Sequence, residues 1–200
     1  MAGLWVTEPS KNDTLHIQSN YNLMKTYIAT AIATAVLVLL PGQALAQNPK
    51  STEKATLGGK AVTLSYSSPS VKGRKVFSPA GPIAKDPNYP VWRAGADSST
   101  TLHTETDLDL GGLTVPKGDY SIYVSLADVD HWELIVNKQT GQWGLTYDES
   151  QDLGRVPMTM NKPPALVETL KYTLTDQGAG NAELKLEWVF RRTTVPIVVK

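Results

Sequence analysis

Cysteine is absent from this chain of 200 residues. The chain therefore forms no disulfide bond, offers no thiolate to a metal ion and carries no lipid-modified cysteine. Net charge is absent too, because 19 basic residues balance 19 acidic ones. A nucleic-acid-binding protein normally has a basic excess on one face, and a protein of the membrane surface has a polybasic segment. We therefore expect no nucleic-acid partner and, after removal of a leader, no membrane contact.

Long apolar runs are rare, and the one present covers residues 28–40. At 13 residues it is shorter than the ~20 residues that a transmembrane helix needs. Lys25 precedes this run, Pro41 follows it, and small residues lead up to Ala46. That order is typical of a secretory signal peptide. We predict a signal peptide over residues 24–46, cleaved after Ala46, and a periplasmic or secreted protein; a retained membrane anchor is the alternative.

The signal begins unusually far from the first residue. Residues 1–23 contain Glu8, Lys11 and Asp13 and add no net positive charge to it. We hypothesise that Met24 is the true initiator and that residues 1–23 are a mis-assigned start or an extended leader. Mass spectrometry of the precursor tests this, because a tryptic peptide from residues 12–22 would contradict it.

Period-two alternation dominates the chain after residue 60, and a stripe of helical spacing is absent. Alternation of apolar and polar residues predicts half-buried strands. The residues 176–181 between the last two predicted strands contain two glycines, which favour a hairpin turn. The predicted strands cover residues 60–67, 101–110, 119–126, 131–137, 169–175 and 182–190.

These strands predict an all-β fold, a single-domain antiparallel β-sandwich over residues 60–200. A jelly-roll-like or barrel-like closure is the alternative. We expect a loose polar lead-in over residues 47–59 and at most one short helical turn, near residues 147–153. Residues 78–90 contain four prolines and one glycine, so they form a long loop rather than a strand. Such loops in compact domains are often functional.

Five motifs occur in a familiar order: LSYSSPSVKGRKVF, VWRAGADSSTTL, LTVPKGDYSIYV, WELIVNKQTGQWG and YDESQDLGRV. Together they resemble the exported bacterial family catalogued as domain of unknown function 2911, over roughly Lys60 to Glu187. The resemblance implies export and a shared fold but no activity. The chain departs from the family at Asp97-Ser98, where relatives often carry Asn-Glu. The matching positions are Pro69, Gly73, Arg74, Trp92, Arg93, Gly95, Thr101, Gly118, Tyr120, Asn137, Trp143, Gly144 and Arg155.

Arg74 lies in a basic loop around Gly73, with Lys72 and Lys75. Glycine lets backbone amides approach an anion, and arginine binds carboxylate or phosphate through two hydrogen bonds. This pattern makes Arg74 a candidate anion ligand. The alternative is a solvated hairpin tip in which Arg74 pairs with an acid of the fold.

His103, Glu105, Asp107 and Asp109 alternate with apolar residues. On one continuous strand they would share a face, and imidazole with carboxylates can bind zinc or manganese. The same alternation is what an exposed strand face requires. A second histidine would have to come from His131, so we predict no metal site and no cofactor.

The main candidate binding site combines aromatic and hydrogen-bonding residues from three segments. Such residues can form a sugar- or peptide-binding groove. In the alternative, Trp92 fills the core and Arg93 forms a buried salt bridge with Asp97, Asp148 or Asp152. The candidate ligand-binding residues, with Arg74, are Trp92, Arg93, Asp97, Asn137, Trp143, Tyr147, Asp148, Asp152 and Arg155.

Catalytic motifs are missing from the sequence: no serine lies in a G-x-S-x-G elbow, and no histidine in a metalloprotease motif. We therefore name no catalytic residue and predict a non-catalytic module that binds a polar small molecule, glycan or peptide in the cell envelope. One alternative is a hydrolase using Asp148 and Asp152 as paired carboxylates, or a site centred on His103. Another is a purely structural envelope protein.

Overall fold

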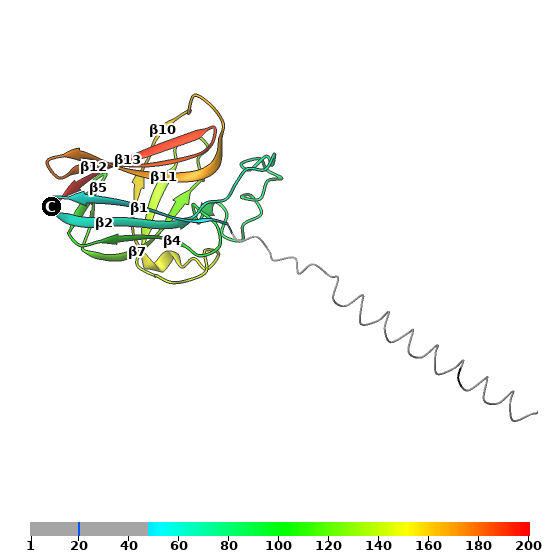
Figure 1. The fold of residues 1–200 in the computed structure, drawn as a ribbon, viewed down its shortest axis with the longest axis horizontal. Helices are drawn as coiled ribbons and strands as arrows, with labels where there is room; N and C mark the ends of the chain where they lie inside the picture. The colour runs from blue at the N-terminus through cyan, green and yellow to red at the C-terminus, as the bar shows by residue number, and fades with distance from the viewer. Residues whose placement is uncertain (1–19, 21–47) are drawn as a thin grey trace, which may run out of the picture. The chain divides into compact units, whose positions relative to one another are not determined.

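Two antiparallel β-sheets lie face to face in a computed structural model, which describes Asn20 and residues 48–200 (Figure 1). All described residues from Asn48 onward belong to one compact unit. The predicted signal peptide, its cleavage site and the proposed start at Met24 lie outside the described residues. Within the described part, no helix has the length and apolar character needed to cross a membrane.

The first sheet has the strand order β1-β2-β4-β7-β8-β9, and β3 pairs with β7. Its strands are β1 (Lys50–Leu57), β2 (Lys60–Ser67), β3 (Val91–Trp92), β4 (Thr100–Thr104), β7 (Gly118–Ser125), β8 (Glu133–Asn137) and β9 (Asp152–Pro157).

The second sheet has the order β11-β12-β13-β5-β6, and β10 pairs with β13. It consists of β5 (Leu108–Leu110), β6 (Leu113–Val115), β10 (Thr159–Asn161), β11 (Val167–Gly178), β12 (Asn181–Val189) and β13 (Arg191–Val199).

The core lies between the two sheets and is built by the predicted alternation. Val62, Leu64 and Tyr66 of β2 are buried, and so are Leu184 and Leu186 of β12. β11 and β12 form the predicted hairpin across residues 176–181. The only helical element within residues 48–200 is the 3₁₀ turn η1 (Glu149–Gln151), in the region where the sequence predicts a short helical turn. The prediction of an all-β antiparallel sandwich is confirmed.

The predicted strand over residues 101–110 is in fact two strands in different sheets. β4 pairs with β2 and β7, whereas β5 pairs with β13 and β6. At the bend between them, Thr104 donates its hydroxyl hydrogen to the carbonyl oxygen of Thr106, at 2.6 Å. Alternation continues through the bend, since Leu102, Leu108 and Leu110 are all buried, so the period-two pattern conceals the change of sheet.

Two further expectations need correction. The lead-in over residues 47–59 is not loose, because it contains β1, which pairs with β2 along its whole length. The alternation over residues 182–190 predicts Phe190 on the same face as Leu184, Leu186 and Trp188, but Phe190 is 48% exposed and the other three are buried. Val189 has a φ of 56°, so the chain turns there into β13 and carries Phe190 away from the core.

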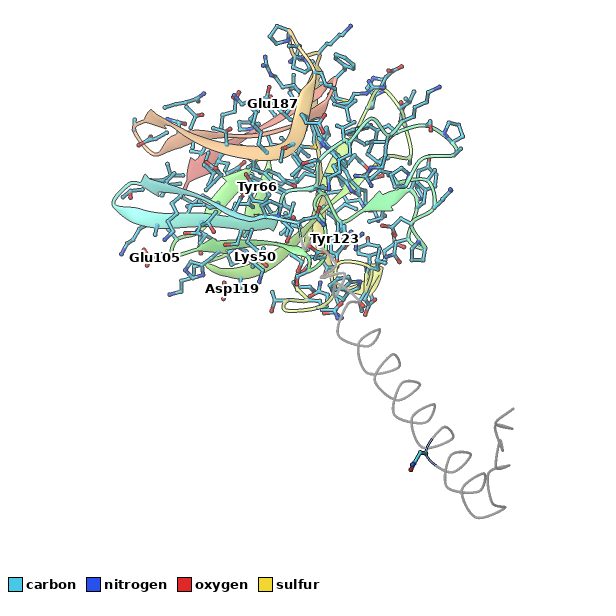
Figure 2. All side chains as sticks on the ribbon, turned by 45° about the vertical axis from the view of Figure 1, so that its right-hand side comes forward. Lys50, Tyr66, Glu105, Asp119, Tyr123 and Glu187 are labelled. Atoms are coloured by element: carbon cyan, nitrogen blue, oxygen red, sulfur yellow. The ribbon has the colours of Figure 1, made fainter. Side chains whose placement is uncertain are left out.

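The outer face of the first sheet is also covered, which alternation did not predict. Ser121 and Tyr123 of β7 are buried although they point away from the sandwich core. Tyr147, from the loop between β8 and β9, packs against Tyr123, with ring centroids 4.9 Å apart. Figure 1 shows this loop, with η1, on the outer side of β7, and Figure 2 labels Tyr123 beside it. We call residues 138–151 the covering loop.

The proline-rich loop, residues 78–90, projects from one end of the sandwich (Figure 1). Backbone hydrogen bonds from Gly81 to Ser78, from Asp86 to Ile83 and from Tyr89 to Asp86 fold it into successive turns. The side chain of Asn88 donates to the carbonyl oxygen of Leu145 at 2.7 Å. The proline-rich loop is thus tied to the covering loop.

Candidate functional site

The segment from Trp92 to Thr100 crosses from β3 into β4 with an unusual backbone. Ala94 and Asp97 have φ values of 48° and 60°, in the left-handed region that non-glycine residues seldom occupy. Hydrogen bonds hold this conformation, because the carbonyl oxygen of Ala94 accepts from the hydroxyls of Tyr172, at 2.9 Å, and Thr100, at 3.2 Å. The strain is therefore supported from the second sheet and from β4 together.

Trp92 is a core residue, as the alternative interpretation held. Its side chain is 2% exposed and stacks on Trp188 of β12, with ring centroids 5.8 Å apart and planes inclined by 14°. Phe77 contacts both indole rings edge-on, at 5.7 and 5.8 Å. Trp132 completes the group, 5.2 Å from Phe77. We call Phe77, Trp92, Trp132 and Trp188 the aromatic layer.

Arg93 does not form the predicted salt bridge with Asp97, Asp148 or Asp152. No ion pair within residues 48–200 includes this half-buried arginine. Its buried Nη1 atom has no hydrogen-bond partner there. The stem of Arg93 packs so closely on Gly144 that a Cβ at Gly144 would lie 2.5 Å from Arg93 Cδ. A Cβ there would also lie 2.7 Å from the backbone oxygen of Asp97, so only glycine fits at position 144.

A cavity of about 150 Å³ opens beside Arg93 and Trp92, at the base of the proline-rich loop. Arg74 lines it too, so the structure brings together three of the predicted site residues. Asp97 does not line the cavity, but its carboxylate accepts a hydrogen bond from the side-chain amide of Asn48, a lining residue, at 3.3 Å. We call this cavity the Arg93 cleft. Its lining residues are Asn48, Pro69, Arg74, Pro82, Ile83, Asp86, Trp92, Arg93, Gly95, Ala96 and Trp188.

A second unpartnered donor belongs to the lining of the same cleft. Trp188 is 4% exposed, and its buried Nε1 has no hydrogen-bond partner within residues 48–200. Arg74 is only partly engaged, because its Nε donates to the carbonyl oxygen of Val71 and one terminal nitrogen donates to that of Ser70. One carboxylate oxygen of Asp86 accepts from the backbone N–H of Asn88. The lining is thus rich in donors and contains one acid.

The second group of predicted site residues forms a closed network around Asp152. Asn137, which is fully buried, donates to one Asp152 carboxylate oxygen at 2.8 Å and to the carbonyl oxygen of Asp148 at 2.8 Å. Tyr147 donates to the other carboxylate oxygen at 2.7 Å. Arg155 pairs with Asp152 at 3.3 Å and with Glu149 at 2.7 Å. We call this group the Asp152 network.

The polar groups of the Asp152 network bond to one another, and these contacts suit a structural role. Burial, followed by the hydrogen bond to Asp152, raises the pKa of Tyr147 above its ordinary value, so this tyrosine stays protonated and keeps donating. The carboxylate of Asp148 accepts from the backbone N–H and the hydroxyl of Ser150 and so caps η1. Both carboxylates therefore have hydrogen-bond partners within the fold, Asp152 in Asn137 and Tyr147 and Asp148 in Ser150.

Trp143 does not join Trp92 in a groove. Its side chain is 53% exposed on the covering loop, whereas Trp92 lies in the core. The backbone of Trp143 forms an isolated β-bridge with Ser98, and Gly144 donates its N–H to the carbonyl oxygen of Asp97. The aromatic groove expected from the sequence therefore separates into a core residue and a surface residue.

The residues of the predicted acidic face are used individually by the fold. His103 pairs with Asp119 at 2.8 Å, and both side chains are well exposed. Glu105 accepts from the backbone N–H of Ala61, and Asp107 from that of Lys117, each at 2.8 Å. Figure 2 labels Glu105 and Asp119 at the same end of the sandwich. Within the part of the chain that the structure describes, no three metal-ligating side chains of His, Asp or Glu lie together.

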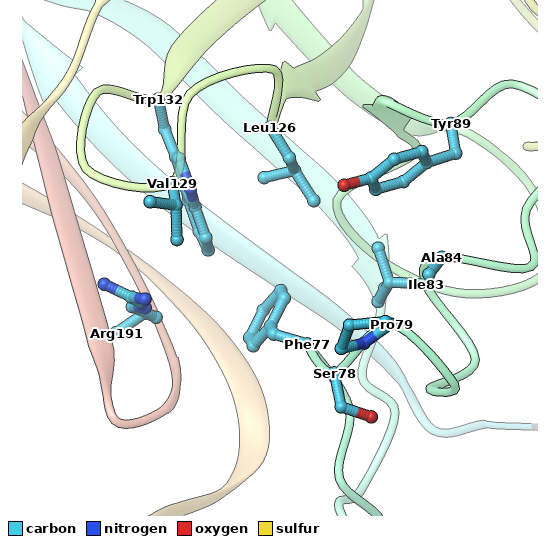
Figure 3. A pocket seen from close by; sticks show the side chains of 10 residues that line it. All are labelled: Phe77, Ser78, Pro79, Ile83, Ala84, Tyr89, Leu126, Val129, Trp132 and Arg191. Atoms are coloured by element: carbon cyan, nitrogen blue, oxygen red, sulfur yellow. The ribbon is translucent and has the colours of Figure 1, made fainter.

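A larger cavity, of about 370 Å³, lies on the other side of the proline-rich loop (Figure 3). Phe77 and Trp132 of the aromatic layer form part of its wall, and Tyr89 and Val129 stand at its rim, 52% and 62% exposed. Ile83 lines both cavities. We call this cavity the aromatic pocket. Its lining residues are Phe77, Ser78, Pro79, Ile83, Ala84, Tyr89, Leu126, Val129, Trp132 and Arg191.

Comparison with known proteins gives one match. Residues 48–197 match the model of a protein family described as Protein of unknown function (DUF2911). The chain belongs to this family. The match extends beyond the stretch predicted from the motifs, residues 60–187, and covers β1 and nearly all of β13. No curated protein and no solved structure matches the chain.

Every residue lining the Arg93 cleft and the aromatic pocket lies within the DUF2911 match. Sequence reasoning found Arg74, Trp92 and Arg93 but missed Trp188 and the whole aromatic pocket. Trp188 stands at a core position of a regular strand, so alternation explains it without a ligand. The sequence signal for both cavities is the proline-rich loop, which supplies Ile83 to each of them.

Proposed function

We propose that this DUF2911 protein is a non-catalytic binding module of the bacterial cell envelope, and that the Arg93 cleft holds an anionic group of its ligand. The observation that carries the proposal is a pair of donors without partners. Arg93 Nη1 and Trp188 Nε1 are both buried, and both residues line the same cleft. An unpaired buried polar group costs free energy, and both of these groups belong to residues that line one cleft, which favours a bound acceptor there.

Two other arginines of the fold, Arg155 and Arg192, support this interpretation, because each of them is paired with an acid. Arg155 contacts two carboxylates, and Arg192 donates to Glu187 at 2.7 Å. A purely structural Arg93 would be expected to pair in the same way. Guanidinium groups bind carboxylates through two parallel hydrogen bonds, and Arg74 stands in the same cleft to reinforce such a contact. The ligand class that fits is a small carboxylate, such as the end of a peptide or an acidic sugar.

The cell-envelope location rests on the sequence of residues 24–46, which has the composition of a cleaved signal peptide. A non-catalytic role rests on chemistry. Asp148 and Asp152 are occupied by the fold, and His103 pairs with Asp119. The donors that remain unpaired suit recognition rather than bond cleavage.

Matched pairs of probes test the proposal on the processed protein. Isothermal titration would compare trialanine as the free acid with its C-terminal amide, and glucuronate with glucose. We expect at least one carboxylate to bind and its neutral counterpart to bind at least tenfold more weakly. Equal binding of both members of each pair, or no binding by any of the four probes, would overturn the proposal.

Arg93→Met should separate binding from folding. Methionine keeps an apolar stem against Gly144 and removes the unpaired charge, so we expect the free energy of unfolding to stay the same or rise by up to about 1 kcal/mol. Carboxylate binding should be lost. Arg155→Met is the matched control: it removes two ion pairs and should lower the free energy of unfolding by about 1 kcal/mol while leaving binding intact. Denaturant titration and calorimetry measure both. A large loss of stability in Arg93→Met would mean that Arg93 is structural.

A further inference from the structure

The aromatic pocket and the Arg93 cleft are neighbours with a common wall. Ile83 lines both. The two linings also touch each other, since Trp92 lines the cleft, Phe77 lines the pocket, and their ring centroids are 5.7 Å apart. One ligand can therefore place an anionic group on one side of Ile83 and an apolar group on the other.

The lining of the aromatic pocket favours an apolar group over a sugar. Six of its ten residues have side chains without any polar atom: Phe77, Pro79, Ile83, Ala84, Leu126 and Val129. Sugar sites need several converging hydrogen-bonding groups, whereas a pocket of this composition suits a hydrophobic side chain. Figure 3 shows Phe77, Ile83, Leu126 and Trp132 directed toward one space, with Tyr89 and Arg191 on opposite sides of it.

The charges around the two cavities favour a peptide over a simple fatty acid. Asp86 stands in the Arg93 cleft beside the arginines and offers an acceptor, which a fatty acid cannot use but a peptide N–H can. Arg191 packs over the ring of Trp132, 5.8 Å from its centroid, and no ion pair within residues 48–200 includes it. Its donors at the pocket wall suit the carbonyl oxygens of a peptide backbone.

We infer that the ligand is a peptide with a free C-terminus, whose carboxylate lies in the Arg93 cleft and whose last side chain, large and apolar, fills the aromatic pocket. This inference rests on the proposed function, because it places the carboxylate where that proposal does. It adds the class of ligand and the determinant of specificity.

A series of tripeptide free acids measures the contribution of the last side chain. Isothermal titration of the processed protein would compare Ala-Ala-Phe with trialanine. Burying a phenylalanine side chain should strengthen binding about ten- to a hundredfold. Octanoate, which has a carboxylate and an apolar chain but no peptide group, should bind at least tenfold more weakly than Ala-Ala-Phe. Tighter binding of octanoate would overturn the peptide assignment.

A pocket-filling variant tests where the side chain binds. Ala84→Phe places a ring in the aromatic pocket from a half-buried position, and the preference for Ala-Ala-Phe should fall to within about threefold. Binding of trialanine, whose last side chain is a single methyl group, should fall by less than binding of Ala-Ala-Phe. Val198→Phe, at an exposed position of β13 outside the pocket lining, is the control and should keep the full preference.

The outcomes separate the two proposals. If trialanine binds but Ala-Ala-Phe gains nothing, or if the gain survives Ala84→Phe, the aromatic pocket is not the specificity site and the inference fails while the proposed function stands. If none of the carboxylate probes, including trialanine and Ala-Ala-Phe, binds, the proposed function itself fails.

Discussion

Replacing Trp92 with alanine is expected to lower the free energy of unfolding by about 3–5 kcal/mol. The indole is 2% exposed and touches the other three members of the aromatic layer. Its removal loses the burial of a large apolar side chain and leaves a cavity between the two sheets. Trp188, the stacking partner, is held in β12 of the other sheet, so the surrounding residues can fill the cavity only in part. Equilibrium unfolding in urea or guanidinium measures the loss.

Trp143→Ala is the matched control for this prediction, since it removes the same side chain from a site that is 53% exposed. Its effect should stay within about 0.5 kcal/mol, because the β-bridge to Ser98 involves only backbone atoms. Comparable losses in the two variants would show that Trp92 is not the core residue described above.

Glu187→Gln should be the most destabilising polar substitution, with a loss of about 2–3 kcal/mol near neutral pH. The Glu187 side chain is 4% exposed on the second sheet (Figure 2), 2.7 Å from Arg192 Nε and 3.2 Å from Lys171 Nζ. Glutamine keeps the shape but leaves these cations without a counter-charge. Because the cations are themselves partly exposed, the loss should be smaller than for a fully buried pair.

The pH dependence of this effect has a definite sign. Burial raises the pKa of Glu187, whereas hydrogen bonds from Arg192 and Lys171 lower it. The lowering is the larger effect, so the pKa lies below its ordinary value. The contribution of Glu187 is therefore complete above the ordinary glutamate pKa, about 4.3, and disappears as the pH falls through the lower pKa of the folded state. The stability difference between wild type and Glu187→Gln should shrink in that range. A difference that stays constant down to pH 3 would contradict this account.

The sandwich was predictable because burial follows a two-residue period in most of its strands, as in Val62, Leu64 and Tyr66. The same rule cannot show which sheet a strand belongs to. Leu102 and Leu108 obey one alternation although the bend between them moves the chain from the first sheet to the second. Nor can it show that Tyr123, on the outer face, lies under a loop more than ten residues later in the chain.

The site was predictable only where unusual residues cluster locally. Trp92 and Arg93 are neighbours in the sequence, and Asn137, Tyr147 and Arg155 do lie together around Asp152 in the structure. Whether such a cluster binds a ligand or only stabilises the fold depends on which of its donors have acceptors within the protein. Those acceptors come from segments distant in the sequence. Arg155 and Arg93 are equivalent as residue types, yet only Arg93 is left unpaired. Trp188 enters the cleft from a strand nearly a hundred residues after Trp92.

The stacked pair of Trp92 and Trp188 also gives the protein an optical signal of its own. Two nearly parallel indoles 5.8 Å apart couple their electronic transitions, and both are held rigidly in the core. Near-ultraviolet circular dichroism should therefore contain a strong contribution from this pair, which vanishes when packing between the sheets is lost even if the strands persist. Since Trp188 also carries an unpaired donor in the Arg93 cleft, the same band should change when an acceptor arrives there. Packing and occupancy can thus be followed without a label.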